Sequence, residues 1–269
     1  MSEHFSPTRI AQKAKRWVVK VGTSVLTDER GGKVTRHRVQ AIASQIAALW
    51  RGGKETVLVT SGAIGIGMGV LDLKVRPHEL AKLQAAAATG QGKLMQWYTA
   101  RLEEEHLHGA QILLTRGDLE DRQRRLNVKA TLETLLKAGI VPIINENDTV
   151  STEEIRYGDN DLLSAHVAAL IGADFLLILT DVDQIVGPEG PLHHVREITP
   201  ELERAARGTD KESSTGGMKT KLEAAKLAMS HNIPLAVMNA GGSVDLIKMQ
   251  VNAEQQGTWF VSPAHGSGR

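Results

Sequence analysis

Short apolar runs alternate along the chain with longer segments in which apolar residues recur every three or four positions. The runs, which predict strands, lie at residues 17–21, 57–59, 111–114, 140–144, 174–179 and 234–238. The helical spacing covers residues 35–50, 80–107, 119–137, 162–170 and 218–231. Strands that are apolar on both faces and alternate with helices predict an α/β fold, a three-layer α/β/α sandwich with a largely parallel central sheet.

Two stretches interrupt this alternation. Residues 149–157 alternate polar and apolar positions, which predicts a hairpin reaching over a site. Residues 183–198 contain two Gly and two Pro, which indicates a loop with short strands. The sequence shows no internal repeat, so we expect a single domain over residues 1–269, with flexible ends at about 1–16 and 262–269.

Two polar clusters carry most of the functional signal. Residues 145–148 (Asn-Glu-Asn-Asp) end a predicted strand, and residues 158–161 (Gly-Asp-Asn-Asp) open a predicted helix. Such polar groups are costly to bury without partners, and ligands of open α/β sheets bind at the carboxyl ends of strands. The alternative is a turn followed by a helix cap. A cap needs only one polar residue of this kind, whereas the two clusters together hold seven. The clusters therefore predict a binding site.

Three turns could hold an anion. Lys20 lies inside an apolar strand before Gly22 and Thr23, where backbone N–H groups could approach a phosphate, although a lysine snorkelling beside an ordinary turn explains the pattern equally well. A glycine-rich turn follows Ser61, and residues 213–221 run into a helix with small residues and two lysines. The turn after Ser61 is neither a Walker A loop nor a dinucleotide fingerprint, and its glycines could serve only close packing. The alternative for residues 213–221 is a flexible loop with a helix cap.

Composition narrows the class of protein. With 32 Lys and Arg against 31 Asp and Glu, the formal charge of +1 implies no polyanionic partner, and 3% aromatic residues argue against nucleic-acid stacking. The chain has no cysteine, which excludes disulfides and thiolate chemistry. No apolar run reaches membrane-spanning length and no secretory signal opens the chain, so we expect a cytoplasmic protein with neither a membrane nor a nucleic-acid partner.

The order of these motifs resembles the amino-acid kinase superfamily over about residues 17–238. The paired clusters are most similar to those of members that phosphorylate the side-chain carboxylate of L-glutamate with ATP, which is the first step of proline biosynthesis. The resemblance implies ATP and Mg²⁺ as cofactors, with Mg²⁺ held mainly through the nucleotide phosphates and with no metal ligand from the protein.

The resemblance also implies roles for individual residues. Lys20 and Lys221 would contact the transferred phosphate, and Asp161 would hold both lysines in place. The amino acid would bind to Ser61, Gly62, Asn145, Asp148 and Asn160. The nucleotide would bind to Lys20, Thr180, Asp181, Thr215, Gly216, Gly217, Met218, Lys219, Thr220 and Lys221.

Further expectations follow from the same resemblance. They are feedback inhibition by proline, a homo-oligomer, a possible glutamyl-phosphate reductase partner, and no C-terminal PUA domain within this length. Residues 183–187 depart from the usual family pattern, which puts adenine contacts in question. Two alternatives stay open: another amino-acid kinase, such as an N-acetylglutamate kinase, and a non-catalytic sensor of glutamate, proline or nucleotide.

Overall fold

The structure is a computed structural model, and it describes residues 6–28, 32–150, 160–207, 217–240, 245–250 and 252–263. The strands are β1 (Arg16–Val21), β2 (Glu55–Thr60), β3 (His108–Leu114), β4 (Ile140–Glu146), β5 (Phe175–Thr180), β6 (Ile185–Gly187), β7 (Gly190–Leu192), β8 (His194–Val195), β9 (Leu235–Asn239) and β10 (Thr258–Phe260). The helices are α1 (Pro7–Lys13), α2 (Thr23–Leu26), α3 (Arg36–Arg51), α4 (Ala63–Val70), α5 (Leu80–Glu104), α6 (Arg116–Glu120), α7 (Arg122–Lys137), α8 (Asn160–Ile171), α9 (Pro200–Arg207), α10 (Met218–Ser230), α11 (Leu246–Met249) and the 3-10 turn η2 (Ala253–Gln255).

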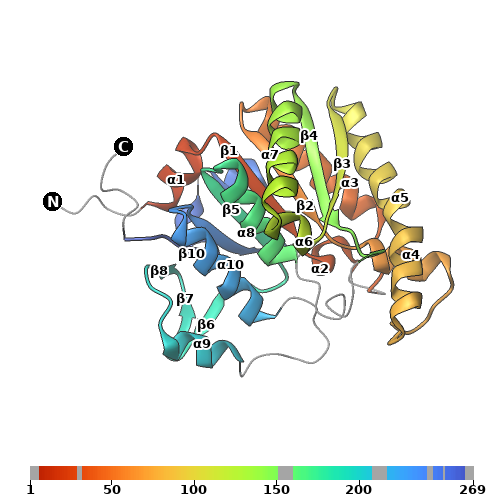
Figure 1. The fold of residues 1–269 in the computed structure, drawn as a ribbon. Helices are drawn as coiled ribbons and strands as arrows, with labels where there is room; N and C mark the ends of the chain where they lie inside the picture. Colours follow the sequence, from red (N-terminus) through yellow and green to blue (C-terminus); the bar gives the residue numbers. More distant parts are fainter. Residues whose placement is uncertain are drawn as a thin grey trace.

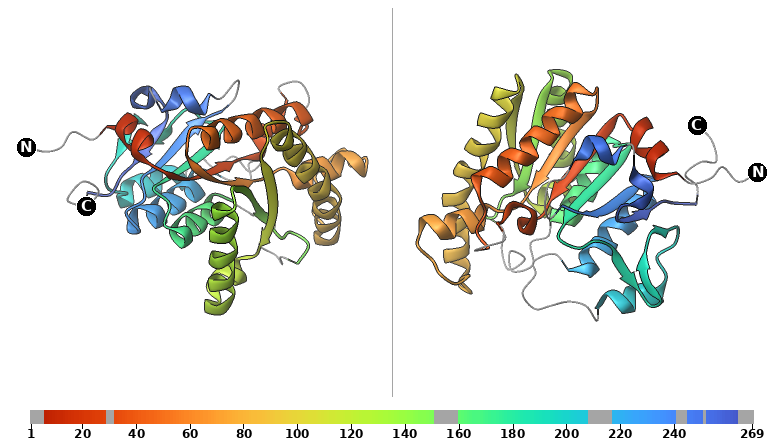
Figure 2. Two further views of the ribbon diagram at one scale, coloured as in Figure 1. Left: turned by 90° about the horizontal axis from the view of Figure 1, so that it is seen from above. Right: turned by 180° about the vertical axis from the view of Figure 1, so that it is seen from behind.

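An eight-stranded sheet in the order β3-β4-β2-β1-β5-β9-β10-β8 forms the middle layer. The first six strands in this order, β3 to β9, run parallel to one another, and β10 pairs antiparallel with β9. Helices α7, α8 and α10 cover the face turned to the viewer in Figure 1, whereas α3 and α5 cover the opposite face, seen from behind in Figure 2. The predicted three-layer α/β/α sandwich is confirmed.

Side chains of each strand alternate between the two faces, and this alternation divides the core in two. Trp17 and Val19 of β1 pack with α3 and α5, whereas Val18 packs with α7, α8 and α10. Lys20 follows Val19, so it points to the α8 and α10 side. Because the central strands are parallel, their carboxyl ends share one edge of the sheet, and the turns after β1, β2, β4 and β5 meet there.

Some predicted elements differ from the structure. The helix predicted over residues 119–137 is two helices, because Asp121 ends α6 and its carboxylate caps α7 by accepting from Arg124 N at 2.8 Å. Helix α1 forms within residues 1–16, the segment expected to be flexible, and buries Ala11. The sequence predicts no helix at α1, α2, α9 or α11 and no strand at β10. Most of the hairpin predicted over residues 149–157 lies outside the described residues.

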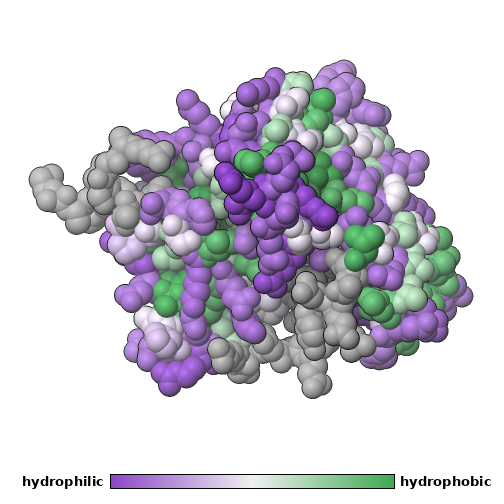
Figure 3. All heavy atoms as spheres, in the orientation of Figure 1, coloured by the Kyte–Doolittle hydropathy of each residue, from purple (hydrophilic) through white to green (hydrophobic). Residues whose placement is uncertain are grey.

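The predicted loop over residues 183–198 does contain short strands, and β6 and β7 pair as a hairpin. The surface in Figure 3 is mainly hydrophilic, with a hydrophobic area over α4 and the segment that follows it. Val70, Leu71 and Val75 are the exposed apolar side chains of that region. Within the part of the chain that the structure describes, no helix combines the length and apolarity needed to cross a bilayer.

Candidate active site

Three charged side chains from distant parts of the chain meet behind the sheet edge. Lys20 of β1 forms an ion pair with Oδ1 of Asp161, the second residue of α8, and Nζ of Lys221 on α10 lies 3.1 Å from Oδ2. Lys20 is 5% exposed, Lys221 4% and Asp161 0%. We call these three residues the ionic cluster. Its formal charge is +1, so it offers a buried positive site.

The charge of Asp161 follows from its neighbours. Burial favours the neutral acid, but the two ammonium groups outweigh burial and hold the pKa of Asp161 below its ordinary value. Thr220 Oγ1 also donates to Oδ2 at 3.4 Å. An ionised Asp161 at the first turn of α8 is further favoured by the helix dipole. The carboxylate therefore fixes both lysine tips in space.

A second group, formed by the amide side chains of Asn145 and Asn160, adjoins the first, and we call it the amide cluster. Asn160 Nδ2 lies within hydrogen-bond distance of three acceptors: the Thr60 carbonyl at 2.7 Å, Ser61 Oγ at 2.9 Å and Asn145 Oδ1 at 3.0 Å. Asn160 Oδ1 is buried and has no hydrogen-bond partner among the described residues. Leaving a buried acceptor unpaired is costly, so this oxygen is suited to receive a hydrogen bond from a ligand.

Asp148 lies in the turn after β4, three residues beyond Asn145 in the sequence. Burial raises the pKa of Asp148 to about 7, nearby Glu146 adds to the shift, and Arg76 opposes it. Burial likewise lowers the pKa of Arg76, and Asp148 counteracts that change. A carboxylate crowded by another negative group attracts a cation, because a bound cation would relieve both the repulsion and the desolvation.

Gly62 and Gly22, two of the glycines predicted at the site, have different structural roles. Gly62 has φ +102°, a left-handed conformation that glycine adopts without strain, and it is the cap that precedes α4, directly after Ser61. The Gly22 N–H donates to the Leu179 carbonyl at 3.1 Å, so this N–H is not free for the phosphate contact that the sequence suggested. A Cβ at this position would make ordinary van der Waals contact with Lys20 Nζ, at 3.7 Å. Thr23 is the first residue of α2, next to Gly22.

The residues predicted to bind nucleotide are only partly together. Gly217 caps α10 and Met218 begins it, which brings Thr220 and Lys221 to Asp161. Lys219 instead points outward and pairs with Glu223 at 3.8 Å, with 55% of its side chain exposed. Thr215 and Gly216 lie outside the described residues.

Thr180 ends β5 at the same sheet edge as the ionic cluster. It is buried, and its hydroxyl donates to Asp181 Oδ1 at 3.2 Å. In the altered loop that follows, Asp183 accepts from Asn239 Nδ2 at 2.6 Å, which ties the loop to the end of β9.

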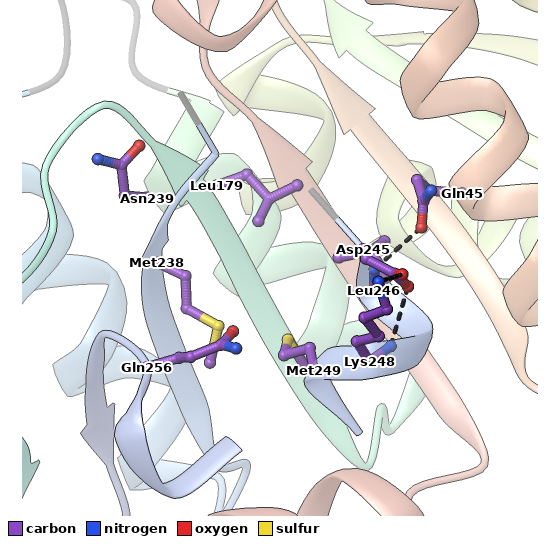
Figure 4. Close-up of a pocket in the computed structure, with 9 residues that line it drawn as sticks. All are labelled: Gln45, Leu179, Met238, Asn239, Asp245, Leu246, Lys248, Met249 and Gln256. Atoms are coloured by element: carbon purple, nitrogen blue, oxygen red, sulfur yellow. Dashed lines mark hydrogen bonds and ion pairs between the residues drawn. The ribbon is translucent and has the colours of Figure 1, made fainter. Parts of the chain in front are cut away.

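A cavity of about 400 Å³ lies elsewhere, between β5, β9 and α11. Leu179, Met238, Leu246 and Met249 give it an apolar wall, and Figure 4 shows Gln45 and Asp245 on its α3 side. Its apolar residues belong to the core half that packs on α3, whereas Lys20 faces α8. None of the site residues predicted from the sequence lines this cavity, so we place the candidate site at the ionic and amide clusters.

Two residues of the site were missed by the sequence analysis, and both come from α5. Gln91 Oε1 accepts from Asn145 Nδ2 at 2.8 Å, and the Tyr98 hydroxyl lies 2.9 Å from Thr60 Oγ1. Burial raises the pKa of Tyr98 despite its bond to Thr60. A glutamine between two glycines in an alanine-rich helix was the one available signal, because it is a polar residue at a closely packed position.

The described residues do not form a metal cage. Among them, His, Cys, Asp and Glu side chains make no group of three or more that could hold an ion. Asp161 is the carboxylate closest to the lysines, and both of its oxygens already face ammonium groups. Mg²⁺ commonly reaches such sites on substrate phosphates with few protein ligands. These residues fit an ion that arrives with the nucleotide and do not fit a site of their own.

Comparisons with known proteins identify the family to which the chain belongs. The amino acid kinase family matches residues 15–239, so the chain belongs to that family. The chain is 46% identical to a glutamate 5-kinase of Moorella thermoacetica, covering 94% of this chain and 68% of the relative. It is also 46% identical to a glutamate 5-kinase of Symbiobacterium thermophilum, with 91% and 95% covered. The carbamate kinase from Giardia lamblia bound to AMP-PNP shares the fold, with a TM-score of 0.60 and 18% identity over 93% of this chain and 99% of that one.

Proposed function

We propose that this protein transfers the γ-phosphoryl group of ATP to the side-chain carboxylate of L-glutamate, giving ADP and L-glutamyl 5-phosphate, the first step of proline biosynthesis. One observation carries the proposal: the ionic cluster and the amide cluster are joined at consecutive residues, Asn160 and Asp161. A cationic site for a phosphoryl group thus adjoins a polar site for an amino acid. The glutamate 5-kinase relatives support this choice of substrate.

The ionic cluster suits phosphoryl transfer to a carboxylate. The attacking carboxylate is ionised at neutral pH, so it needs no general base. One of its oxygens forms a bond to the γ-phosphorus while the bond from phosphorus to the ADP oxygen breaks, and ADP leaves with that electron pair. Negative charge on the transferred group is then stabilised by Lys20 and Lys221, which Asp161 keeps in position.

The amide cluster suits the α-amino group of the acceptor. Asn160 Oδ1 is an unpaired buried acceptor, and Asp148 is a carboxylate whose environment favours a bound cation. A free ammonium group satisfies both, whereas an acetylated amino group brings no charge for Asp148. This difference favours glutamate over N-acetylglutamate as the acceptor. ATP is the nucleotide, and Mg²⁺ would arrive on its phosphates and reduce their charge.

The proposal is tested by trapping the acyl phosphate with hydroxylamine and by measuring ADP release. We expect turnover with L-glutamate and little with L-aspartate, N-acetylglutamate or UMP. Lys221→Met should keep the fold and lower kcat by about 10²–10³-fold, the usual loss for one charge-stabilising donor. Glu223→Gln, a change two residues further along α10 on its exposed side, is the control and should leave kcat unchanged. Turnover with another acceptor alone would overturn the substrate assignment.

Three further properties belong to the proposal, and the resemblance to this family supports them. They are inhibition by proline at the glutamate site, assembly into a homo-oligomer, and transfer of the labile product to a glutamyl-phosphate reductase. The exposed Val70, Leu71 and Val75 are an apolar surface that subunit contacts could cover. The proposal also places the enzyme in the cytoplasm.

A further inference from the structure

Gln91 is a half-buried polar residue that the proposed reaction does not use directly. It lies in the middle of α5, and its Oε1 accepts from Asn145 Nδ2 at 2.8 Å. Its Nε2 is buried and has no hydrogen-bond partner among the described residues. An apolar residue at this position would avoid the cost of burying an unpaired donor. The hydrogen bond that Gln91 accepts from Asn145 therefore calls for an explanation.

The amide groups at this site can adopt one orientation only. Asn160 must turn its NH₂ group toward Thr60, because a backbone carbonyl can only accept. Asn145 must turn its Oδ1 toward the backbone N–H of Glu146, 2.9 Å away, because that group can only donate. The NH₂ group of Asn145 then points away from Asn160 and needs an acceptor, and Gln91 Oε1 supplies it.

The orientation of Asn145 decides what Asn160 shows to a ligand. With Asn145 Oδ1 accepting at 3.0 Å, the NH₂ group of Asn160 stays directed into the protein and its Oδ1 is left for an incoming donor. If Asn145 were turned over, two NH₂ groups would face each other. Asn160 would then lose one of its acceptors, and its presentation to an ammonium group would be less fixed.

The position of Gln91 is itself fixed by close helix packing. A Cβ on Gly90 would lie 1.8 Å from the Ala63 carbonyl, so α5 touches the backbone of α4 one residue after Gly62. Tyr98, two turns further along α5, holds Thr60. Helix α5 therefore contacts the ends of both β2 and β4, where the proposed amino-acid site lies.

We propose that Gln91 is a positioning residue for the amino-acid substrate: by accepting from Asn145, it locks the amide cluster in the orientation that presents Asn160 Oδ1 to the α-ammonium of glutamate. The inference rests on the proposed function. Gln91 acts through Asn145, so it controls the affinity for glutamate and leaves the phosphoryl site unaffected. A role confined to packing would instead reduce stability and alter both substrates together.

The test compares Gln91→Met, which removes the acceptor at similar volume, with Gln96→Met, the same change at an exposed position of α5. We expect Gln91→Met to raise the KM for glutamate about tenfold, as for loss of one buried hydrogen bond. The KM for ATP should stay within about twofold, and Gln96→Met should match the wild type. If Gln91→Met is too unstable to purify, Gln91→Ala takes its place with the same expectation.

A double-mutant cycle with Asn145→Ala separates positioning from packing. Once Asn145 is gone, Gln91 has nothing to orient, so adding Gln91→Met should change the KM for glutamate by less than about twofold. Independent multiplication of the two effects would overturn the inference, as would an unchanged KM in Gln91→Met when the wild type turns over glutamate. Absence of glutamate turnover in the wild type would overturn the proposed function and this inference with it.

Discussion

Asn160 and Asp161 are neighbours in the sequence, yet their side chains belong to two different networks. Asp161 holds two ammonium groups, whereas Asn160 holds a hydroxyl and two carbonyl oxygens. The sequence located both residues, because so many amide and carboxylate groups at a helix start exceed what a cap requires. For Lys20, the sequence supported two interpretations equally well: a phosphate contact and a lysine that snorkels beside an ordinary turn. The pairing of Asp161 with both lysines came from the family resemblance, since no spacing rule connects positions so far apart.

At the residue scale, Asp148 predicts how the KM for glutamate depends on pH. Its pKa of about 7, raised by burial and by Glu146, means that it is ionised above pH 7 and protonated below. The protonated form cannot attract the ammonium group of glutamate. We therefore expect the KM for glutamate to rise about tenfold between pH 8 and pH 6, following the fraction ionised, with a much smaller change in the KM for ATP. Steady-state kinetics from pH 5.5 to 8.5 measure this.

Asp148→Asn is the control for that experiment. It should have a high KM for glutamate at every pH, so a wild-type profile that is equally flat would contradict the role of Asp148. The same raised pKa bears on stability. Between pH 4 and 7 the folded protein keeps a proton that the unfolded chain has lost, so the wild type loses stability as pH rises through this window. Asp148→Asn should therefore raise Tm more at pH 8 than at pH 5.

At the scale of elements, apolar periodicity was sufficient for the parallel strands, most of which are buried on both faces, and for the longest helices, α3, α5, α7, α8 and α10, which each bury one continuous face. It failed where tertiary contacts decide. Strand β10 is three residues long and gains its place by pairing with β8 and β9. Helix α1 is held by Ser6 and Thr8, whose hydroxyls donate to Glu254 near the other end of the chain. The role of Gln91 could not be predicted for the same reason, because its hydrogen-bond partner lies on another element.

The contact between α4 and α5 gives a prediction at this scale. A Cβ on Gly90 would lie 1.8 Å from the Ala63 carbonyl, whereas a Cβ on Gly92 would meet nothing within 4 Å. Gly90→Ala should separate the helices, lower Tm by several degrees and raise the KM for glutamate, because Gly62 of the proposed amino-acid site is the residue that caps α4. Gly92→Ala gains helix propensity of about 1 kcal/mol and should raise Tm slightly. Thermal unfolding and glutamate kinetics check both, and equal behaviour of the two variants would contradict this packing argument.

At the scale of the whole molecule, the sheet divides the candidate site between two sets of strands. The amide cluster is built on β2, β4 and the first residue of α8 with support from α5, whereas the ionic cluster is built on β1 with α8 and α10. The carboxyl ends of β2, β1 and β5 are adjacent in the sheet order, so the two substrates would meet above β1. This arrangement could be anticipated from a parallel sheet alone. The residues that face each other across the site could not be anticipated, because their positions depend on the helices that pack behind the sheet.

The two clusters share only the start of α8 and otherwise rest on different elements, so each substrate should stabilise the fold through its own set of residues. A ligand at about 100 times its Kd adds about 2.7 kcal/mol, which raises Tm by roughly 5 °C or more in a chain of this size. Glutamate should give this rise in the wild type and in Lys221→Met but not in Asp148→Asn. A non-hydrolysable ATP analogue with Mg²⁺ should give it in Asp148→Asn and much less in Lys221→Met. If either variant lost both responses, the two clusters could not be independent binding sites, and the acceptor and the nucleotide would share residues that this geometry keeps apart.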